Sequence, residues 1–465
     1  MQASQRRRLK VPAAASVWYV ATGVVTKAVG MLMTPVFTRI LTGEEYGAYT
    51  LYMSWLGLAS TVALGAISQG VIYKCFQRYG RDESQPTVML TAMAVTGAVA
   101  TLALIPAVSL GGISPILVPL MLLQLLFDTV ISVRTVSLRY TYSYKQIALS
   151  GALQAIGAPL LSVLLISTTG LGAYARILGL LAVTGAVAVP LAVGILRRGG
   201  AFDGERRRYL LSGSARLLPH LIAGAVISQA DKLMLSFYHG EAVLARYSVA
   251  HTVGYGLVFA VGGIGAALNP WIMRKLRAGR EDEVRDIAGL LTRVISQATV
   301  FLVAIAPEAL RLLAPAEYST ALPAVLPIVL TTLPSFVAGL CSTVAVFSER
   351  GAAVSAASVP AAAVNIAAGL LLIPEFRYTG AAFSLLLAHL CSMVLQLCVL
   401  KKCRLLLPVS GDKLLAALAS SSILGVLVYL AYPLPWLRVL LLIPPALSAV
   451  GAVLSLKEKI ADVPS

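Results

Sequence analysis

A lysine stands in the middle of the first apolar segment, where a charged side chain is unfavourable. Lys27 shares a stripe with Gly23, Gly30, Thr34 and Thr38, and this spacing places all five residues on one helical face. An ionisable group at membrane depth costs at least about 2.5 kcal/mol and normally faces a hydrated cavity or a partner. Close helix packing explains the small residues of the stripe but not the lysine. We therefore expect Lys27 to face a cavity.

A second polar group interrupts a later apolar segment. Ser228, Gln229, Asp231 and Lys232 fall within about a turn and a half of one helix. Because Asp231 and Lys232 are adjacent, their side chains point about 100° apart, and each is expected to have another partner. For Asp231, one candidate partner is Lys27 or an arginine. Two interpretations stay open: a cavity-facing binding group, or a structural ion pair between helices.

Three further cations are candidates for the same cavity. Arg39 closes the first apolar segment, whereas Arg176 and Arg293 lie early in theirs, where they can also extend to a surface. Asp128 is expected to pair with Arg134 or another cation. These charges leave a net positive interior, which attracts an anion such as a phosphate or pyrophosphate headgroup. An exporter of cationic drugs would instead be expected to carry embedded carboxylates.

The elements that position these residues are membrane spans. The chain has 465 residues, of which 58% are hydrophobic and only 12% charged, whereas a soluble domain carries roughly 25% charged residues. No charged side chain occurs between Glu83 and Asp128, a stretch long enough for two spans of about 20 residues each. The sequence therefore predicts an all-α polytopic membrane protein.

The apolar runs predict fourteen transmembrane helices, and the charges between them predict their orientation. Most of the 37 Lys and Arg residues fall in the N-terminal tail, the even-numbered loops and the C-terminal tail. By the positive-inside rule both termini are then cytoplasmic, and the net charge of +17 reflects topology rather than nucleic-acid binding. The odd-numbered loops hold only Arg39, Arg246, Arg311, Arg377 and Arg438. The expected helices are 15–40, 48–72, 86–108, 115–137, 147–168, 172–196, 214–238, 246–270, 287–312, 322–347, 353–374, 379–400, 414–433 and 437–456.

A weak internal repeat divides the chain into two halves. Gly43-Glu44 follows the first span and Gly240-Glu241 follows the seventh, each pair preceding a Tyr-Thr or Tyr-Ser pair. Paired halves around a midplane site are common in transporters. The basic loop between the halves is expected to sit on anionic headgroups or to dock a partner enzyme. The predicted organisation is an N-terminal lobe of six spans (1–196), a cytoplasmic basic loop (197–213), a C-terminal lobe of six spans (214–404) and two extra spans with a tail (405–465).

Prolines inside the spans are candidate hinges, because a helical proline removes a backbone hydrogen bond and kinks the helix. Pro35 and Pro219 are the expected hinges, although prolines are frequent in transmembrane helices in any case. The chain lacks an ATP-binding phosphate loop and any loop with a catalytic Ser/His/Asp or paired acidic set. Its five cysteines have no metal-ligand spacing. We expect neither an enzyme nor a cofactor or metal site.

Several motifs resemble one family of membrane proteins. Residues 38–49 (TRILTGEEYGAY) resemble the arginine- and tyrosine-containing signature of Wzx-like polysaccharide flippases, within the multidrug/oligosaccharidyl-lipid/polysaccharide exporter superfamily. Thr42 stands where that signature usually has glycine. Further similar segments are 229–235 (QADKLML), 269–271 (NPW), 314–327 with its tyrosine and prolines, and the run of Asn365, Ile373-Pro374 and Gly380-Ala381-Ala382.

The resemblance implies a V-shaped two-lobe fold that works by alternating access. It implies a lipid-linked anionic glycan as cargo, usually an oligosaccharide on undecaprenyl pyrophosphate, moved across the bacterial cytoplasmic membrane for surface polysaccharide such as lipopolysaccharide or capsule. Lys27, Arg39 and Lys232 match the cationic positions thought to hold the pyrophosphate and sugar. Membrane lipids are expected contacts, and glycosyltransferases or a polymerase of the same pathway are candidate partners. In lipid II flippases two extra helices help form a groove for the lipid tail, which spans 13 and 14 match by analogy.

Three alternatives remain. A multidrug antiporter of the same superfamily would transport a cationic dye without any lipid-linked sugar. A lipid II flippase would rescue peptidoglycan synthesis. A membrane glycosyltransferase or polymerase would need a large extracytoplasmic loop with catalytic carboxylates, and the odd-numbered loops are too short to hold one.

Overall fold

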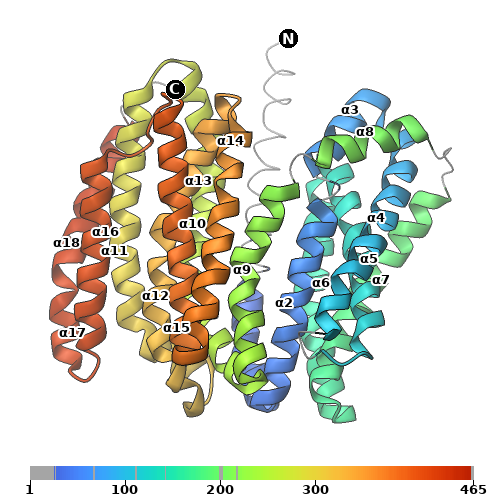
Figure 1. The fold of residues 1–465 in the computed structure, drawn as a ribbon, viewed down its shortest axis with the longest axis horizontal. Coiled ribbons are helices and arrows are strands. Elements are labelled where there is room, and N and C mark those ends of the chain that lie inside the picture. The colour runs from blue at the N-terminus through green and yellow to red at the C-terminus, as the bar shows by residue number, and fades with distance from the viewer. Residues whose placement is uncertain are drawn as a thin grey trace. The chain divides into compact units, whose positions relative to one another are not determined.

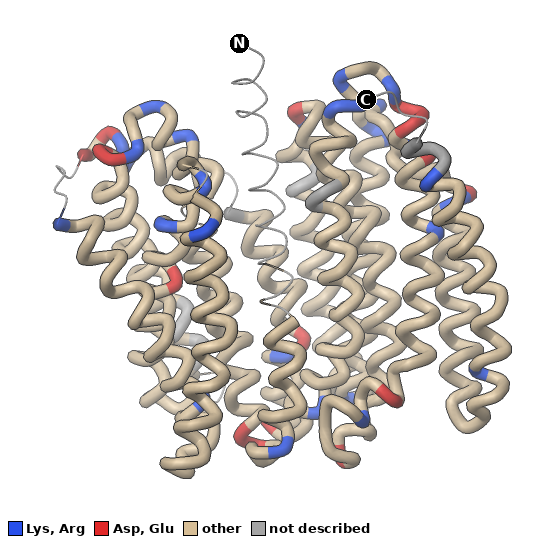
Figure 2. The backbone as a smooth tube through the Cα atoms, turned by 180° about the vertical axis from the view of Figure 1, so that it is seen from behind, with Lys and Arg blue, Asp and Glu red and all other residues tan. Residues whose placement is uncertain are grey.

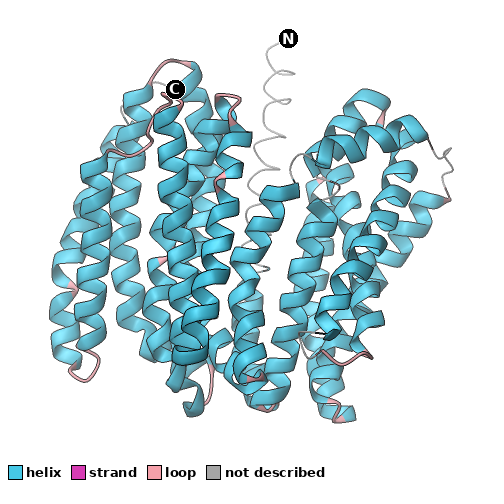
Figure 3. Cartoon of the chain, viewed as in Figure 1, coloured by secondary structure: helices cyan, strands magenta, loops and turns pink. Residues whose placement is uncertain are grey.

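Every element in the described part of the chain is helical (Figure 3). The computed structural model describes residues 23, 26, 28–65, 67, 69–109, 113–141, 143–197, 203–215 and 218–461. Within a membrane no water bonds the backbone, so each segment satisfies its N–H and C=O groups inside its own helix. The predicted all-α class is confirmed.

Most of the described helices are suited to crossing a membrane. Eleven are long and apolar enough, or up to twelve if the bent pair Gly204–Ser214 and Pro219–His239 forms one span. Lys, Arg, Asp and Glu gather at the helix ends and are sparse along their middles (Figure 2). The chain is therefore a multi-pass membrane protein, as predicted. Of the first expected span, 15–40, the structure describes mainly the helix Ala28–Ile40.

The chain divides into two compact units. Unit 1 comprises residues 1–229 and 240–245, and unit 2 comprises residues 230–239 and 246–465. The division falls within α9 (Leu218–His239) and near the start of α10 (Glu241–Arg277), so each of these helices contributes to both units.

In unit 1 the short helices α3 (Gln69–Tyr79) and α8 (Gly204–Ala215) pack against each other and against the longer helix α4 (Arg81–Ser109). The core of unit 1 joins Phe76 of α3, Met89 of α4, Val133 of α5 and Leu210 of α8, all buried. Helix α6 packs along α7, and α5 contacts both α4 and α7. Its helices are α2 (Gly43–Gly65), α3 (Gln69–Tyr79), α4 (Arg81–Ser109), α5 (Leu117–Tyr140), α6 (Tyr144–Thr169), α7 (Gly172–Leu196), α8 (Gly204–Ala215) and the first part of α9.

The contact between α6 and α7 depends on a glycine. A Cβ atom on Gly179 would lie 2.8 Å from the Ser162 backbone, closer than real Cβ atoms come. The Ser162 hydroxyl donates hydrogen bonds to the Ala158 carbonyl (2.7 Å) and to the Arg176 carbonyl across the helix pair (3.1 Å). Small residues at helix contacts let backbones approach closely in membranes, and here that approach fixes the position of Arg176.

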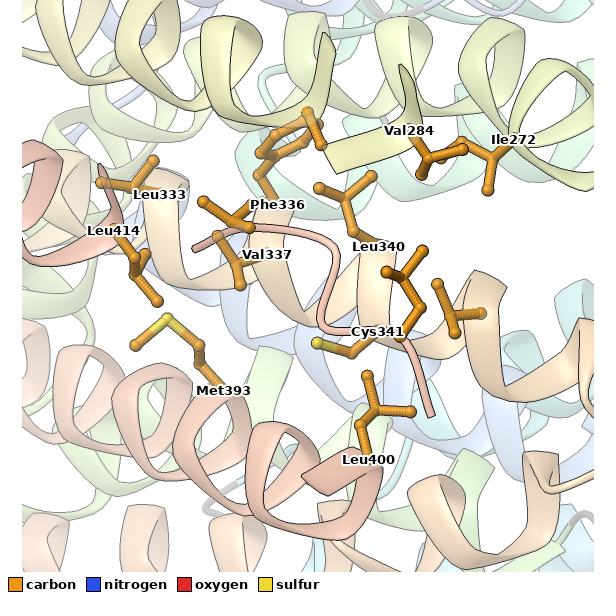
Figure 4. Close-up of a cluster of buried hydrophobic side chains, with 14 of the residues drawn as sticks. Ile272, Val284, Leu333, Phe336, Val337, Leu340, Cys341, Met393, Leu400 and Leu414 are labelled. Atoms are coloured by element: carbon orange, nitrogen blue, oxygen red, sulfur yellow. The ribbon is translucent and has the colours of Figure 1, made fainter. Parts of the chain in front are cut away.

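Unit 2 is built around α13, which is apolar on most sides and buried accordingly. Leu340 and Cys341 of α13 pack with Met393 of α15 and Val284 of α11 (Figure 4). Its helices are the rest of α9 and α10, then α11 (Glu281–Leu313), η1 (Ala316–Ala321), α12 (Leu322–Leu330), α13 (Thr332–Phe347), α14 (Gly351–Ala356), α15 (Ser358–Lys402), α16 (Gly411–Leu430), α17 (Pro435–Leu441) and α18 (Ile443–Ala461).

Helix α15 contains a sharp break. Arg377 has φ 50° and ψ −123°, a non-helical conformation inside the element. A Cβ atom on Gly380 would lie 2.2 Å from the Leu372 carbonyl oxygen. In a straight helix residues eight apart are about 12 Å apart along the axis, so the chain folds back on itself here. The expected spans 353–374 and 379–400 lie on either side of this break.

The last helices of unit 2 pack onto one side of α11. Both α16 and α18 contact α11 along their length, as Figure 1 shows. At one end of this contact the Tyr432 hydroxyl donates to the Val303 carbonyl (2.7 Å). There Arg438 bonds the Ala304 carbonyl (3.0 Å) and forms a two-point ion pair with Glu308 (2.6 and 3.1 Å). These bonds tie the α16–α18 hairpin to α11 at that end.

Candidate functional site

Arg176 lies in an aromatic enclosure within unit 1. Its guanidinium carbon is 3.6 Å from the ring centre of Tyr49, 3.8 Å from Phe37 and 5.1 Å from Tyr46. Cation–π contacts of this kind stabilise a guanidinium that has left bulk water. The Nη1 atom is buried without a hydrogen-bond partner among the described residues. A half-buried cation with an unused donor is suited to an anionic ligand.

The sequence pattern indicated Arg176 but not its aromatic neighbours. Tyr46 and Tyr49 belong to the motif that carries the family resemblance, and they come from the start of α2. Gly47, between them, meets the start of α10, because a Cβ atom there would lie 1.9 Å from the Glu241 carbonyl oxygen. Glu241 belongs to the second copy of the internal repeat, so the two repeated segments are in contact. That repeat was the signal in the sequence that could have linked these tyrosines to a site.

The residues of the first span are only partly described. Lys27 lies outside the described residues. The Arg39 side chain is exposed and donates from Nη1 to the Pro35 carbonyl of its own helix (2.8 Å). Thr34 and Thr38, on the predicted stripe, are buried and donate to backbone carbonyls of their own helix.

Asp231 and Lys232 are both buried in α9, within unit 2. The closest partner of Asp231 is the Tyr247 hydroxyl of α10, which donates to Oδ2 at 2.5 Å. Lys232 Nζ reaches back to Asp231 Oδ1 at 3.7 Å, longer than a hydrogen bond. The sequence suggested Lys27 or an arginine as the partner of Asp231, whereas the structure shows the Tyr247 hydroxyl and, at longer range, the neighbouring Lys232. The site thus holds one carboxylate, one ammonium and a phenol in a protected environment.

An aromatic face of α10 continues from Tyr247. His251 stacks on Tyr255 with ring centres 4.4 Å apart, and Phe259 follows one turn later in edge contact with Tyr255. Their spacing of four residues places them on one helical face. In α15 of the same unit, Asn365 is fully buried, and neither side-chain amide atom has a hydrogen-bond partner among the described residues. In the sequence, Asn365 belonged to a motif that resembles the family but was not predicted to be a site residue.

Arg293 has different neighbours from the other candidate cations. It lines a cavity of about 360 Å³ formed by α11, α16 and α18 within unit 2. Its Nε donates to the Ser448 hydroxyl at 2.8 Å. The sequence predicted correctly that Arg293 lies near the start of a membrane-spanning helix, but it did not indicate which helices would face this residue.

Asp128 has a neutral partner instead of the expected cation. Its Oδ1 accepts a hydrogen bond from Gln124 one turn earlier (3.0 Å), and Gln124 also donates to Thr184 of α7 (3.3 Å). The ion pairs within the described part of the chain do not include Asp128. The expected pair with Arg134 was wrong, because the side chain four residues away on the same helix face reaches the carboxylate first.

Pro219 is the second residue of α9, a position where a proline leaves the helical hydrogen bonds intact. It directly follows a bend of 57° between Gly204–Ser214 and Pro219–His239. Among the described residues no three His, Cys, Asp or Glu side chains are placed to hold a metal ion.

Comparison with solved structures shows the fold. The lipid II flippase MurJ in an inward closed conformation is 13% identical, with a TM-score of 0.70, and the match covers 96% of this chain and all of that one. An inward-facing MATE-family multidrug resistance transporter of the MOP superfamily is 14% identical, with a TM-score of 0.63, over 82% of this chain and 92% of that one. A MOP-superfamily transporter from Pyrococcus furiosus is 13% identical, with a TM-score of 0.57, over 87% and 96% of the two chains. The fold is that of MOP-superfamily transporters.

The sequence also matches a family. No curated protein matches the chain significantly. Residues 36–319, more than half of the chain, match the family described as polysaccharide biosynthesis protein. The motifs identified in the sequence pointed to a polysaccharide export family, and that recognition is confirmed by the family match. The chain belongs to the polysaccharide biosynthesis family, with the fold of MOP-superfamily transporters.

Proposed function

We propose that this protein moves a lipid-linked anionic glycan, an oligosaccharide on an undecaprenyl pyrophosphate type carrier, across the bacterial cytoplasmic membrane for surface polysaccharide synthesis. The observation that carries the proposal is the family match over residues 36–319 on a transporter fold. The family connects the chain with polysaccharide synthesis, and the fold connects it with transport. Lipopolysaccharide and capsule are both compatible destinations.

The physical task is to carry a charged, sugar-bearing headgroup through hydrocarbon while its tail stays in lipid. Cationic side chains at membrane depth can replace the water around the phosphates. Lys27, Arg39, Arg176 and Lys232 are the proposed contacts, with Asp231 holding Lys232 in place. Arg176 supports this assignment, because its aromatic enclosure leaves a buried N–H group unused. Arg293, which the sequence also assigned to this set, lines the cavity between α11, α16 and α18.

The proposed mechanism is alternating access by two six-helix lobes, 1–196 and 214–404, with spans 13 and 14 in 405–465. Fourteen spans follow if the break at Arg377 separates two of them, if α9 crosses the membrane, and if 15–40 forms the first. Pro35 and Pro219 are the proposed hinges. Both termini are proposed to be cytoplasmic, with the basic loop 197–213 available to glycosyltransferases or a polymerase of the pathway.

Purified full-length protein in liposomes provides the test. A lipid-linked oligosaccharide carrying a fluorescent sugar should become accessible to a membrane-impermeant quencher at a rate that depends on the protein. Liposomes with a cationic dye and liposomes with lipid II serve as parallel arms. Transport of the dye alone would identify a multidrug antiporter, and transport of lipid II alone would identify a lipid II flippase. Either result would overturn the proposal.

A deletion strain gives the matching cellular test. Loss of surface polysaccharide with preserved growth is expected, and it should be restored by the wild-type chain. Loss of viability restored by the chain would favour the lipid II alternative.

A further inference from the structure

A cavity with a mixed polar and apolar lining opens on the side of unit 2 where the last helices pack against α11. It has a volume of about 360 Å³ and lies between α11, α16 and α18, which are neighbours in Figure 1. Its lining contains two cations and no carboxylate. The lining residues are Gly289, Leu290, Arg293, Gln297, Lys413, Ala416, Ala417, Ser420 and Ser448.

The known contacts of Arg293 and Lys413 leave some of their N–H donors available to a ligand. Arg293 spends its Nε–H on the Ser448 hydroxyl at 2.8 Å, which orients the guanidinium. Its two Nη groups still carry four N–H donors, the fork that matches a phosphate. Lys413 Nζ is 3.4 Å from Asp286 Oδ1, and both side chains are about half exposed. Such a loose pair leaves the ammonium free to bind a second anion.

A buried amide adds an acceptor to the same cavity. Gln297 is only 4% exposed, and its Nε2 donates to the Ser420 hydroxyl at 3.3 Å. Its Oε1 is buried without a hydrogen-bond partner among the described residues. Buried polar atoms normally have a partner. A hydroxyl group of a bound molecule would supply the missing donor.

The cavity lies at the end of α16 where its apolar stretch begins. Lys413 directly precedes the apolar stretch of α16, and Ser420 lies about 10 Å farther along that helix. The cavity therefore begins beside the start of the apolar stretch of α16 and extends about 10 Å along that helix. Leu415, Ile423 and Leu447 of the neighbouring helix faces are 60–70% exposed, as side chains that contact acyl chains would be.

We propose that this cavity binds the headgroup of an anionic glycerophospholipid, with Arg293 and Lys413 on the phosphate and Gln297 accepting a hydrogen bond from a headgroup hydroxyl. Phosphatidylglycerol has this combination of groups. Basic cavities between transmembrane helices on the cytoplasmic side commonly bind anionic headgroups, and the orientation proposed above places this cavity on that side. The bound lipid joins α16 and α18 to α11 at the end opposite the Arg438–Glu308 pair.

Lipid binding to the purified full-length protein in detergent tests this inference independently of transport. Native mass spectrometry and thermal unfolding are measured with phosphatidylglycerol, phosphatidylcholine, undecaprenyl phosphate or inorganic phosphate. Phosphatidylglycerol should bind with one saturable site and raise the unfolding temperature more than phosphatidylcholine. Equal binding of the two phospholipids would overturn the proposal. A preference for undecaprenyl phosphate would assign the cavity to the carrier lipid instead, and equal stabilisation by inorganic phosphate would reduce it to a free-phosphate site.

Four variants locate the lipid. Arg293→Gln should weaken phosphatidylglycerol binding roughly tenfold, because it removes charge-assisted hydrogen bonds. Lys413→Gln should weaken it less, and Gln297→Leu should reduce the preference for phosphatidylglycerol over phosphatidic acid, which lacks the headgroup glycerol. Arg285→Gln is the matched control, since it removes one positive charge from the same helix outside the cavity. Unchanged affinity in Arg293→Gln, or an equal loss in Arg285→Gln, would refute the site. If Arg293→Gln does not fold, Lys413→Gln and Gln297→Leu carry the test.

Discussion

The Tyr247 hydroxyl donates a hydrogen bond to the buried carboxylate of Asp231, and this bond joins α10 to α9 inside unit 2. Tyr247 is the tyrosine of the second repeat, and its counterpart Tyr49 in the first repeat contacts Arg176. Equivalent tyrosines thus support an anionic side chain in one unit and a cationic one in the other. The repeat preserves a supporting residue, while the charge that it supports differs.

Replacement of Tyr247 by phenylalanine should destabilise the protein. The change removes a hydrogen bond to a buried charged group. A bond of this kind stabilises the folded state by about 2 kcal/mol. Thermal unfolding of purified protein in detergent measures the effect. Tyr255→Phe is the control, because no hydrogen bond from the Tyr255 hydroxyl to a described residue is present. An equal effect of the two changes would contradict a specific contribution of the Tyr247–Asp231 bond.

The aromatic enclosure of Arg176 gives a second prediction. Tyr49→Leu should lower stability by about 1 kcal/mol through loss of a cation–π contact, and Tyr49→Phe should have little effect because the ring face remains. Arg176→Gln should abolish surface glycan while the protein still reaches the membrane. The comparison uses thermal unfolding and immunodetection of surface polysaccharide. Normal glycan in Arg176→Gln would remove Arg176 from the proposed binding set.

Lys27→Ala and Lys232→Ala should abolish glycan export without preventing membrane insertion. The reason is that each removes a positive charge proposed to contact the phosphates of the cargo. Lys145→Ala, at an exposed position of α6, is the matched control and should export normally. Lys232→Ala also leaves Asp231 without its nearby ammonium, so the double variant Asp231→Asn/Lys232→Ala separates transport from stability. Restored export in the double variant would exclude Lys232 as a substrate contact.

Gly47→Ala should prevent accumulation of folded protein. Its Cβ would lie 1.9 Å from the Glu241 carbonyl oxygen, and a backbone atom has little freedom to move away. Overpacking of this kind costs about 3 kcal/mol or more. Gly194→Ala is the control, because nothing lies within 4 Å of the added methyl group. The amounts of monodisperse protein extracted from membranes should differ strongly between the two variants, and comparable amounts would contradict the close approach of Gly47 to Glu241.

The sequence by itself determined the membrane class, the helical segments and the charged residues that interrupt them. Apolar length and the distribution of Lys and Arg are local properties, so they are readable without a fold. Five short motifs were enough to indicate the superfamily. The position of each charge on its own helix followed from the helical repeat.

Only the tertiary structure decided what each charge faces. Arg293 lines a cavity together with α16 and α18, whose residues lie far away in sequence. Asp128 bonds to Gln124 instead of an arginine, and Asp231 bonds to Tyr247 of the next helix. Helical periodicity gives the direction of a side chain relative to its own helix axis. The neighbour in that direction depends on how helices pack, which is set by side-chain shape along whole contacts such as that of Gly179 with Ser162.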